Sequence, residues 1–125
     1  MKHLIPLITL ALYSGLASAA PTAAPVRAEI NALLTTLQTS ACQFKRNDSW
    51  YSGAEAKDHL LRKLDYFEGR TTVQSSEQFI ELAATQSSSS GKAYQVKCGA
   101  AQPVESKQWL TAQLSVLRGA PGGKK

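Results

Sequence analysis

Three residues with acid–base chemistry recur at four-residue intervals in the middle of the chain: Glu55, His59 and Lys63. On a helix this spacing places all three side chains on one face. A histidine beside a carboxylate can act as a general base, and a nearby lysine can stabilise an anion, as a small hydrolase would require. A structural explanation is stronger, because Glu55 can cap the helix while His59 donates one hydrogen bond to a neighbouring segment. We therefore predict no catalytic residue here. Glu55 and His59 are only two potential metal ligands, which is too few for a metal site. We therefore predict neither a metal site nor a cofactor.

Four consecutive serines at residues 87–90 precede Gly91 and offer hydroxyl groups. A catalytic triad with His59 could be drawn, but no GxSxG motif surrounds these serines. Small polar residues next to a glycine are typical of a loop, which is our prediction for this run.

Aromatic residues flank a predicted hairpin turn at Asn47 and Asp48. Trp50 and Tyr51 follow the turn, and Arg46 precedes it. Because side chains alternate along a strand, one ring should point inward and the other outward. Packing is the favoured explanation, and a recognition surface formed by an exposed ring beside Arg46 is the alternative.

The elements that position these residues follow from the spacing of apolar residues and from the caps. We expect helices over residues 25–40 and 53–68, a shorter third helix capped by Ser75 or Ser76, and a fourth over residues 106–117. A hairpin over residues 42–52 and a strand over residues 93–98 complete the prediction. The expected fold class is α+β, mainly helical, with about four helices around a small antiparallel sheet.

Two cysteines, Cys42 and Cys98, are the only ones in the chain. In an exported protein an even number of cysteines favours a disulfide, and here only one pairing is possible. No CxxC redox motif is present, and His59 alone cannot complete a zinc site. The predicted disulfide would place the strand over residues 93–98 beside the start of the hairpin.

The first nineteen residues have the pattern of a secretory signal peptide. Lys2 precedes an apolar run over residues 4–16, and residues 17–19 form the small-x-small motif that signal peptidase recognises. The run is too short for a membrane span, and the mature chain has no second one, so no integral membrane segment is expected after cleavage. We expect cleavage before Ala20. The predicted parts are a signal peptide at 1–19, one globular domain at 20–118 and a tail at 119–125.

The formal charge of +5 decreases when the predicted parts are considered separately. Removal of Lys2 leaves +4, and Lys124 and Lys125 belong to the tail, so the predicted domain carries about +2. Its basic residues alternate with acidic ones along the chain. Nucleic-acid binding requires clustered basic residues, so we do not predict it.

Together, the motifs of the mature chain resemble the YfeK-like family of small exported bacterial proteins, a domain of unknown function. The motifs that carry the resemblance are Cys42-x-Phe44-x-Arg46-Asn47-x-x-Trp50-Tyr51, Glu55-Ala56-x-x-His59-Leu60-x-x-Lys63, Glu77-x-Phe79-Ile80, Ser87-x-Ser89-x-Gly91-x-x-Tyr94 and Cys98. Asp48 departs from the pattern, where the family has a glycine. The resemblance implies a periplasmic location in a Gram-negative bacterium and no assigned activity.

A second resemblance is confined to residues 90–94. Ser90, Gly91 and Tyr94 are similar to the SGxxY loop with which bacterial inhibitors of C-type and I-type lysozymes block the active site. Lys92 would suit a cleft lined by carboxylates. Those inhibitors are β-barrels, whereas this chain is predicted to be mainly helical, so a glycine turn before a strand with a packed Tyr94 is the favoured explanation.

We therefore predict a periplasmic, non-enzymatic binding or accessory module with an unidentified protein or envelope component as its partner. A lysozyme-inhibitor-like protein acting through Ser90, Gly91 and Tyr94 is the first alternative, and a small hydrolase using His59 and Glu55 is the second. The candidate binding residues are Arg46, Trp50, Tyr51, Glu55, His59, Lys63, Ser90, Gly91 and Tyr94.

Overall fold

The computed structural model describes residues 20–119. The predicted signal peptide and residues 120–125 of the predicted tail lie outside the described residues. Along the chain the elements are α1 (Ala24–Thr39), β1 (Gln43–Arg46), β2 (Ser49–Ser52), α2 (Gly53–Glu68), α3 (Ser76–Ala83), β3 (Gln95–Lys97), β4 (Val104–Glu105) and α4 (Ser106–Leu117). Four helices and a four-stranded antiparallel sheet confirm the predicted fold class.

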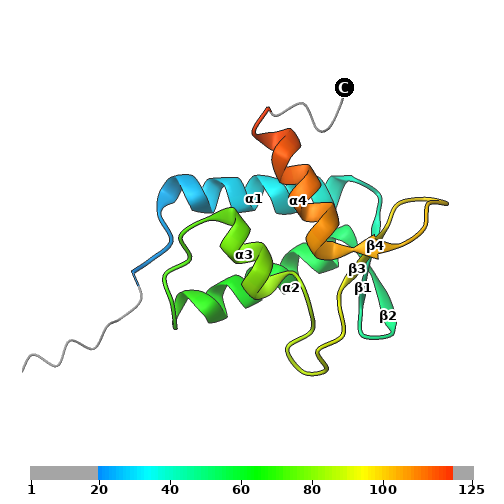
Figure 1. Cartoon of the computed structure of the whole chain (residues 1–125), viewed down its shortest axis with the longest axis horizontal. Coiled ribbons are helices and arrows are strands. Elements are labelled where there is room, and N and C mark those ends of the chain that lie inside the picture. The colour runs from blue at the N-terminus through cyan, green and yellow to red at the C-terminus, as the bar shows by residue number, and fades with distance from the viewer. Residues whose placement is uncertain (1–19, 120–125) are drawn as a thin grey trace, which may run out of the picture.

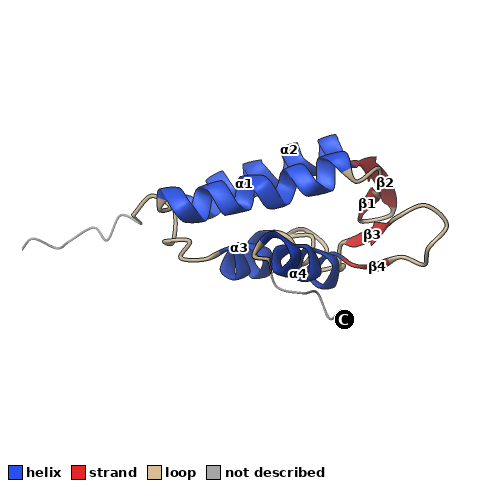
Figure 2. Cartoon of the chain, turned by 90° about the horizontal axis from the view of Figure 1, so that it is seen from above, coloured by secondary structure: helices blue, strands red, loops and turns tan. Residues whose placement is uncertain are grey.

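The helices form two layers, and the sheet lies at one end of them (Figures 1 and 2). Helices α1 and α2 make one layer, and α3 and α4 make the other. Helix α1 buries Ile30, Leu33, Leu34 and Leu37, whose three- and four-residue spacing defines its inner face. Between residues 20 and 119, no helix is both long and apolar enough to cross a bilayer.

The sheet has the order β2-β1-β3-β4, with every neighbouring pair antiparallel. Phe44 at its centre pairs with Val96 and Tyr51, so these three residues share the inner face. Strand β4 was not predicted, because its two residues, Val104 and Glu105, are too few to show alternation.

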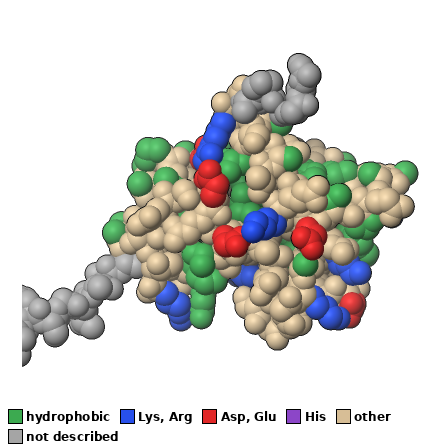
Figure 3. Space-filling model, in the orientation of Figure 1, with side chains coloured by type: hydrophobic (Ala, Val, Ile, Leu, Met, Phe, Trp, Pro, Cys, Tyr) green, Lys and Arg blue, Asp and Glu red, His purple; other side chains and the backbone are tan. Residues whose placement is uncertain are grey.

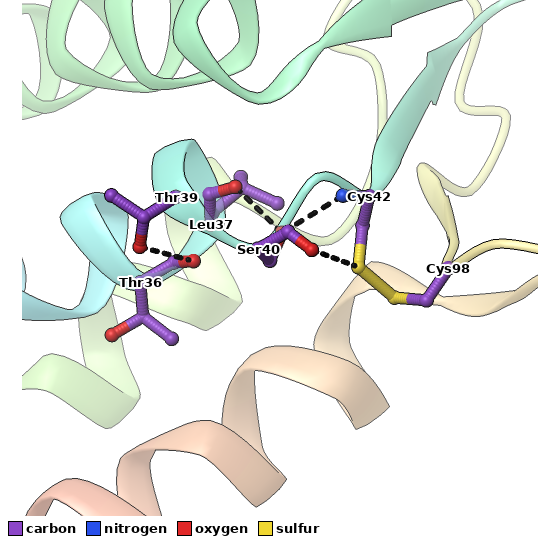
Figure 4. The surroundings of a disulfide bond; sticks show 6 residues. All are labelled: Thr36, Leu37, Thr39, Ser40, Cys42 and Cys98. Atoms are coloured by element: carbon purple, nitrogen blue, oxygen red, sulfur yellow. Dashed lines mark hydrogen bonds between the residues drawn. A yellow bond between two sulfur atoms is a disulfide. The ribbon is translucent and has the colours of Figure 1, made fainter.

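The disulfide joins Cys42 and Cys98, with an S–S distance of 2.04 Å (Figure 4). It links the residue before β1 to the residue after β3, which confirms both the predicted pairing and the predicted position of the strand. The backbone N–H of Cys42 donates to the hydroxyl of Ser40, and that hydroxyl donates to the carbonyl of Leu37, at 3.1 and 2.8 Å. The end of α1 is therefore connected directly to the start of the sheet.

The start of α2 is fixed by the predicted capping box. The N–H of Glu55 donates to the hydroxyl of Ser52 at 3.1 Å, and the Glu55 carboxylate accepts from the N–H of Ser52 at 3.0 Å. Gly53 follows directly and is buried against the end of α1. A Cβ on Gly53 would lie 2.4 Å from the carbonyl oxygen of Leu37, so only glycine allows the two helices to approach this closely.

Two predicted details were wrong. The strand over residues 93–98 is shorter, because Ala93 forms an isolated bridge with Gln86, and the regular ladder begins at Gln95. The apolar spacing of α4 predicts a buried Leu117, but Leu117 is 42% exposed, since it lies in the last turn of the helix. The bridge closes the serine-rich loop of residues 87–92, which the structure confirms as a loop.

Candidate functional site

Glu55, His59 and Lys63, which were predicted to share one face of α2, do not all contact one another in the structure. Glu55 is exposed, and its carboxylate accepts the backbone N–H of Ser52. That hydrogen bond lowers the pKa of Glu55. His59 and Lys63 are half-buried, and both point toward Tyr94, which comes much later in the chain. The structure therefore brings His59 and Lys63 together and leaves Glu55 in the cap.

Tyr94 is the residue on which His59 and Lys63 converge. Its hydroxyl lies 3.1 Å from Nε2 of His59 and 3.0 Å from Nζ of Lys63. The tyrosine is 1% exposed, and its ring packs on Phe44 with the ring centroids 4.9 Å apart. Lys63 also donates to the carbonyl oxygen of Gln86 at 3.0 Å, which connects α2 to the base of the serine-rich loop.

Arg46 determines which nitrogen of His59 carries the proton. A guanidinium nitrogen of Arg46 lies 3.3 Å from Nδ1 of His59, and a guanidinium has only donors. Nδ1 must therefore accept, which assigns the ring proton to Nε2 and makes His59 a donor to Tyr94. Because Lys63 is a second donor, both lone pairs of the Tyr94 oxygen are occupied, and its own O–H proton is available to another acceptor.

The electrostatics of this cluster keep His59 neutral. Burial, followed by the charges of Arg46, Lys63 and Arg62, lowers the pKa of His59 to about 4. Burial, with a smaller effect of Arg46, also lowers the pKa of Lys63. The pKa of Tyr94 is raised by burial, which the charge of Arg46 partly opposes. At neutral pH, His59 is therefore an uncharged donor, and Tyr94 keeps its proton.

A pocket of about 560 Å³ opens beside this cluster. Its wall combines cationic, aromatic and hydroxyl side chains, namely Arg46, His59, Arg62, Lys63, Tyr66, Phe67, Ser87, Ser88, Ser89 and Tyr94. Three of these residues are cations, and among the described residues that line the pocket none is an aspartate or a glutamate. The pocket therefore presents positive charge on a partly aromatic surface.

Several lining residues were not predicted as part of a site. Arg62, Tyr66 and Phe67 were missed, although the spacing from His59 through Lys63 to these residues is that of one helix face. The apolar spacing of α2 predicts Phe67 in the core, and Phe67 does contact the core while also lining the pocket. The helical spacing could have indicated that these residues line one site. It did not do so, because this face of α2 carries both apolar and polar residues.

The predicted aromatic surface on the hairpin is also divided. Tyr51 is half-buried on the inner face, where the Arg46 guanidinium lies 5.8 Å from its ring centroid. Tyr51 and Arg46 line a second, smaller pocket of about 200 Å³, which shares Arg46, His59 and Arg62 with the larger one. Trp50 pairs with Lys45 on the opposite face and is 37% exposed. One ring therefore points inward and the other outward, but only Tyr51 accompanies Arg46.

The serine-rich loop is attached to the hairpin turn through its second half. Ser90 donates to the amide oxygen of Asn47 at 2.5 Å, and Nζ of Lys92 lies 3.2 Å from a carboxylate oxygen of Asp48. Gly91 adopts a φ of +74° between them, a conformation that favours glycine. Tyr94 is buried, so its side chain is not presented to a partner as an inhibitory loop would require.

The same attachment bears on catalytic interpretations of the loop. Ser89 and Lys92 have Ser-x-x-Lys spacing, but the Lys92 ammonium is paired with Asp48, and the Ser89 hydroxyl lies 3.0 Å from that of Ser87. Over residues 20–119, no group of three or more histidine, cysteine, aspartate or glutamate residues is positioned to hold a metal ion.

Charge on the rest of the molecule is mixed. On the face shown in Figure 3, acidic and basic side chains lie next to one another in small groups, and polar and apolar surface lies between these groups. The ion pairs of Arg118 with Glu29 and Glu77 and of Lys107 with Glu81 are examples of this neutralised surface. The gathering of Arg46, Arg62 and Lys63 is local to the pocket, and the alternation of charge along the sequence had concealed it.

Comparison with known proteins identifies a family. No curated protein and no solved structure matches the chain. A family model described as a family of unknown function, DUF5329, matches residues 24–118, from the first turn of α1 to the end of α4. The match covers all four helices, the sheet and the pocket, so the chain belongs to this family of unknown function.

Proposed function

We propose that this protein is a non-enzymatic binding module, and that its ligand carries a negative charge that occupies the 560 Å³ pocket. One observation supports this most strongly: three cationic side chains surround the pocket, and no described residue in its wall carries a carboxylate. An anion would supply the missing counter-charge.

The pocket cations differ from Arg27 and Arg118 in their partners. Arg27 and Arg118 form ion pairs with carboxylates at 2.6 and 2.7 Å. Arg46, Arg62 and Lys63 form no such pair with any residue of the described range. A half-buried ammonium without a counter-ion is unfavourable, and burial and repulsion both destabilise its charged form. A bound oxyanion would relieve that cost and accept hydrogen bonds from Arg46, Lys63 and the Tyr94 hydroxyl.

Two other functions receive less support. A hydrolase would need a base, but burial and the neighbouring cations lower the pKa of His59 and so weaken it as a base, and the Glu55 carboxylate is engaged in the helix cap. A lysozyme inhibitor acting through Ser90 and Tyr94 would need a tyrosine that protrudes into the enzyme's cleft, but Tyr94 is 1% exposed and faces this protein's own pocket.

We also propose that the module acts outside the cytoplasm, in the bacterial periplasm, as a member of the YfeK-like group. The signal-peptide pattern of residues 1–19 and the Cys42–Cys98 disulfide support this location, because disulfides persist in oxidising compartments. The unidentified partner is then an acidic component of the cell envelope.

Titration with sodium sulfate tests the anion site directly. The chloride concentration is lowered in parallel so that the ionic strength stays constant, and binding is followed by two-dimensional NMR of the ¹⁵N-labelled mature protein. We expect saturable shifts at pocket residues and loss of saturation in Lys63→Met and in Arg62→Gln, where the exposed Arg62 can be changed without disturbing the core. Lys107→Met, which removes an exposed cation outside the pocket, should behave as the wild type. Non-saturating shifts, or equal shifts in Lys63→Met, would refute the proposal.

A further inference from the structure

The wall that α2 contributes to the pocket changes character along the helix. His59, Arg62 and Lys63 come first, and Tyr66 and Phe67 follow one turn later. With a rise of about 1.5 Å per residue, the nine positions from His59 to Phe67 extend over about 12 Å. The pocket therefore has a polar, cationic end and an aromatic end along a wall of roughly the length of a small organic molecule.

The polar end of the pocket carries several hydrogen-bond donors. Lys63 and Tyr94 are in contact at 3.0 Å, and Arg46 lies on the other side of His59 at 3.3 Å. The assignment of His59 as a donor leaves the Tyr94 O–H proton without an acceptor in this network. An acidic group placed here would accept that proton together with hydrogen bonds from the two cations.

At the aromatic end, one ring is exposed to solvent and the other is partly buried. Tyr66 is 54% exposed, and its ring lies edge-to-face with Phe67, with the centroids 5.2 Å apart. The Arg70 guanidinium lies 3.6 Å from the centroid of the Tyr66 ring, which orients that ring. Such an exposed ring beside a partly buried one offers a flat apolar surface, which an inorganic anion would leave unused.

The size of the pocket also exceeds what an inorganic anion requires. Its volume of about 560 Å³ falls within the range of about 300–1,000 Å³ that is typical of sites for organic ligands. Ser87, Ser88 and Ser89 of the loop also line the pocket, so hydroxyl groups, cations and rings share its wall.

We infer that the ligand is an amphipathic anion, with an acidic group held by Arg46, Lys63 and Tyr94 and a flat, ring-containing body against Tyr66 and Phe67. This inference rests on the proposed anion-binding function and adds the chemistry of the rest of the ligand. The cations favour a ligand with a negative charge, and the rings favour a ligand with a flat, ring-containing part.

Two fluorescent probes with the same ring system test the inference. 8-Anilinonaphthalene-1-sulfonate carries a sulfonate, and N-phenyl-1-naphthylamine is its uncharged counterpart. We expect the sulfonate to bind the mature protein with one saturable site and to be displaced by sulfate, and the uncharged probe to bind at least tenfold more weakly. Loss of one charge-assisted hydrogen bond in Lys63→Met should weaken the sulfonate about tenfold or more.

The aromatic end is tested with a variant whose fold is not at risk. Tyr66→Ser removes an exposed ring and should weaken the sulfonate probe several-fold while leaving sulfate binding unchanged. The matched control is Trp50→Ser, which removes an exposed ring on the outer face of the sheet and should change neither affinity.

The outcomes separate the two proposals. If sulfate saturates the pocket but does not displace the sulfonate probe, or if Tyr66→Ser binds that probe as the wild type does, the amphipathic ligand is refuted and the anion site remains. If both probes bind equally and Lys63→Met affects neither, the anion site is refuted as well.

Discussion

Replacement of His59 by glutamine should remove a pH dependence of folding stability that the wild type shows between pH 7 and pH 5. The pKa of His59 is about 4 in the folded protein and 6.5 as its ordinary value, so the unfolded chain binds more protons in this interval. The stability that neutral His59 contributes is complete above pH 6.5, and it declines as the pH falls toward 4. Glutamine can accept from Arg46 and donate to Tyr94 as the neutral ring does, but it does not titrate.

The magnitude follows from the two pKa values. For a shift from 6.5 to about 4, the linkage relation gives a loss of about 2 kcal/mol between pH 7 and pH 5. Because His59 is only half-buried, solvent screens the interactions with Arg46, Lys63 and Arg62, and we reduce the expected loss to about 1 kcal/mol. His59 and His3 are the only histidines of the chain, and His3 belongs to the predicted signal peptide, so few other groups titrate in this interval.

Urea unfolding of the mature protein, followed by tryptophan fluorescence at pH 7 and pH 5, measures this difference. The wild type should lose about 1 kcal/mol more than His59→Gln over the interval. Asp58→Asn, which changes the exposed neighbour of His59, should lose as much as the wild type. An equal pH dependence in the wild type and His59→Gln would show that the histidine is not held neutral by its neighbours.

Two further predictions concern the covalent structure. Replacement of both Cys42 and Cys98 by alanine should lower the free energy of unfolding by about 4 kcal/mol, because the disulfide closes a loop with a sequence separation of 56 residues. Urea unfolding at pH 7 measures this loss, and a loss below about 1 kcal/mol would contradict the loop-closure argument. Mass spectrometry of the full-length chain expressed in a Gram-negative host should find a periplasmic protein that begins at Ala20 and is two hydrogens lighter than its reduced form. An uncleaved chain in the cytoplasm would contradict the predicted export.

Local patterns were sufficient to predict most of the fold. The capping box at Ser52 and Glu55 placed the start of α2 because both of its hydrogen bonds lie within four residues. The predicted disulfide placed β3 beside β1, which no local pattern could have done. By contrast, β4 depends on its pairing with β3, and the exposure of Leu117 depends on where α4 meets the other helices.

The site was less predictable than the fold. His59 and Lys63 were predicted to share a face, and they do. Their partners Arg46 and Tyr94 lie 13 and 35 residues from His59 along the chain, so their contacts depend on how the hairpin and the loop pack against α2. Glu55 has the correct helical spacing but takes no part in the cluster, because its carboxylate caps the amino-terminal end of α2.

The cation cluster is best understood by comparison with the rest of the molecule. Arg27 and Arg118 are paired with carboxylates at 2.6 and 2.7 Å. Beside Arg46 and Lys63 the structure instead places a neutral histidine and a tyrosine, and both arrangements leave the positive charge uncompensated. Uncompensated charge in a pocket lowers the stability of the empty protein and raises the affinity for an anion by the same interaction. Burial has the largest effect in lowering the pKa of His59, and the charges of Arg46, Lys63 and Arg62, which would also attract an acidic ligand, lower it further.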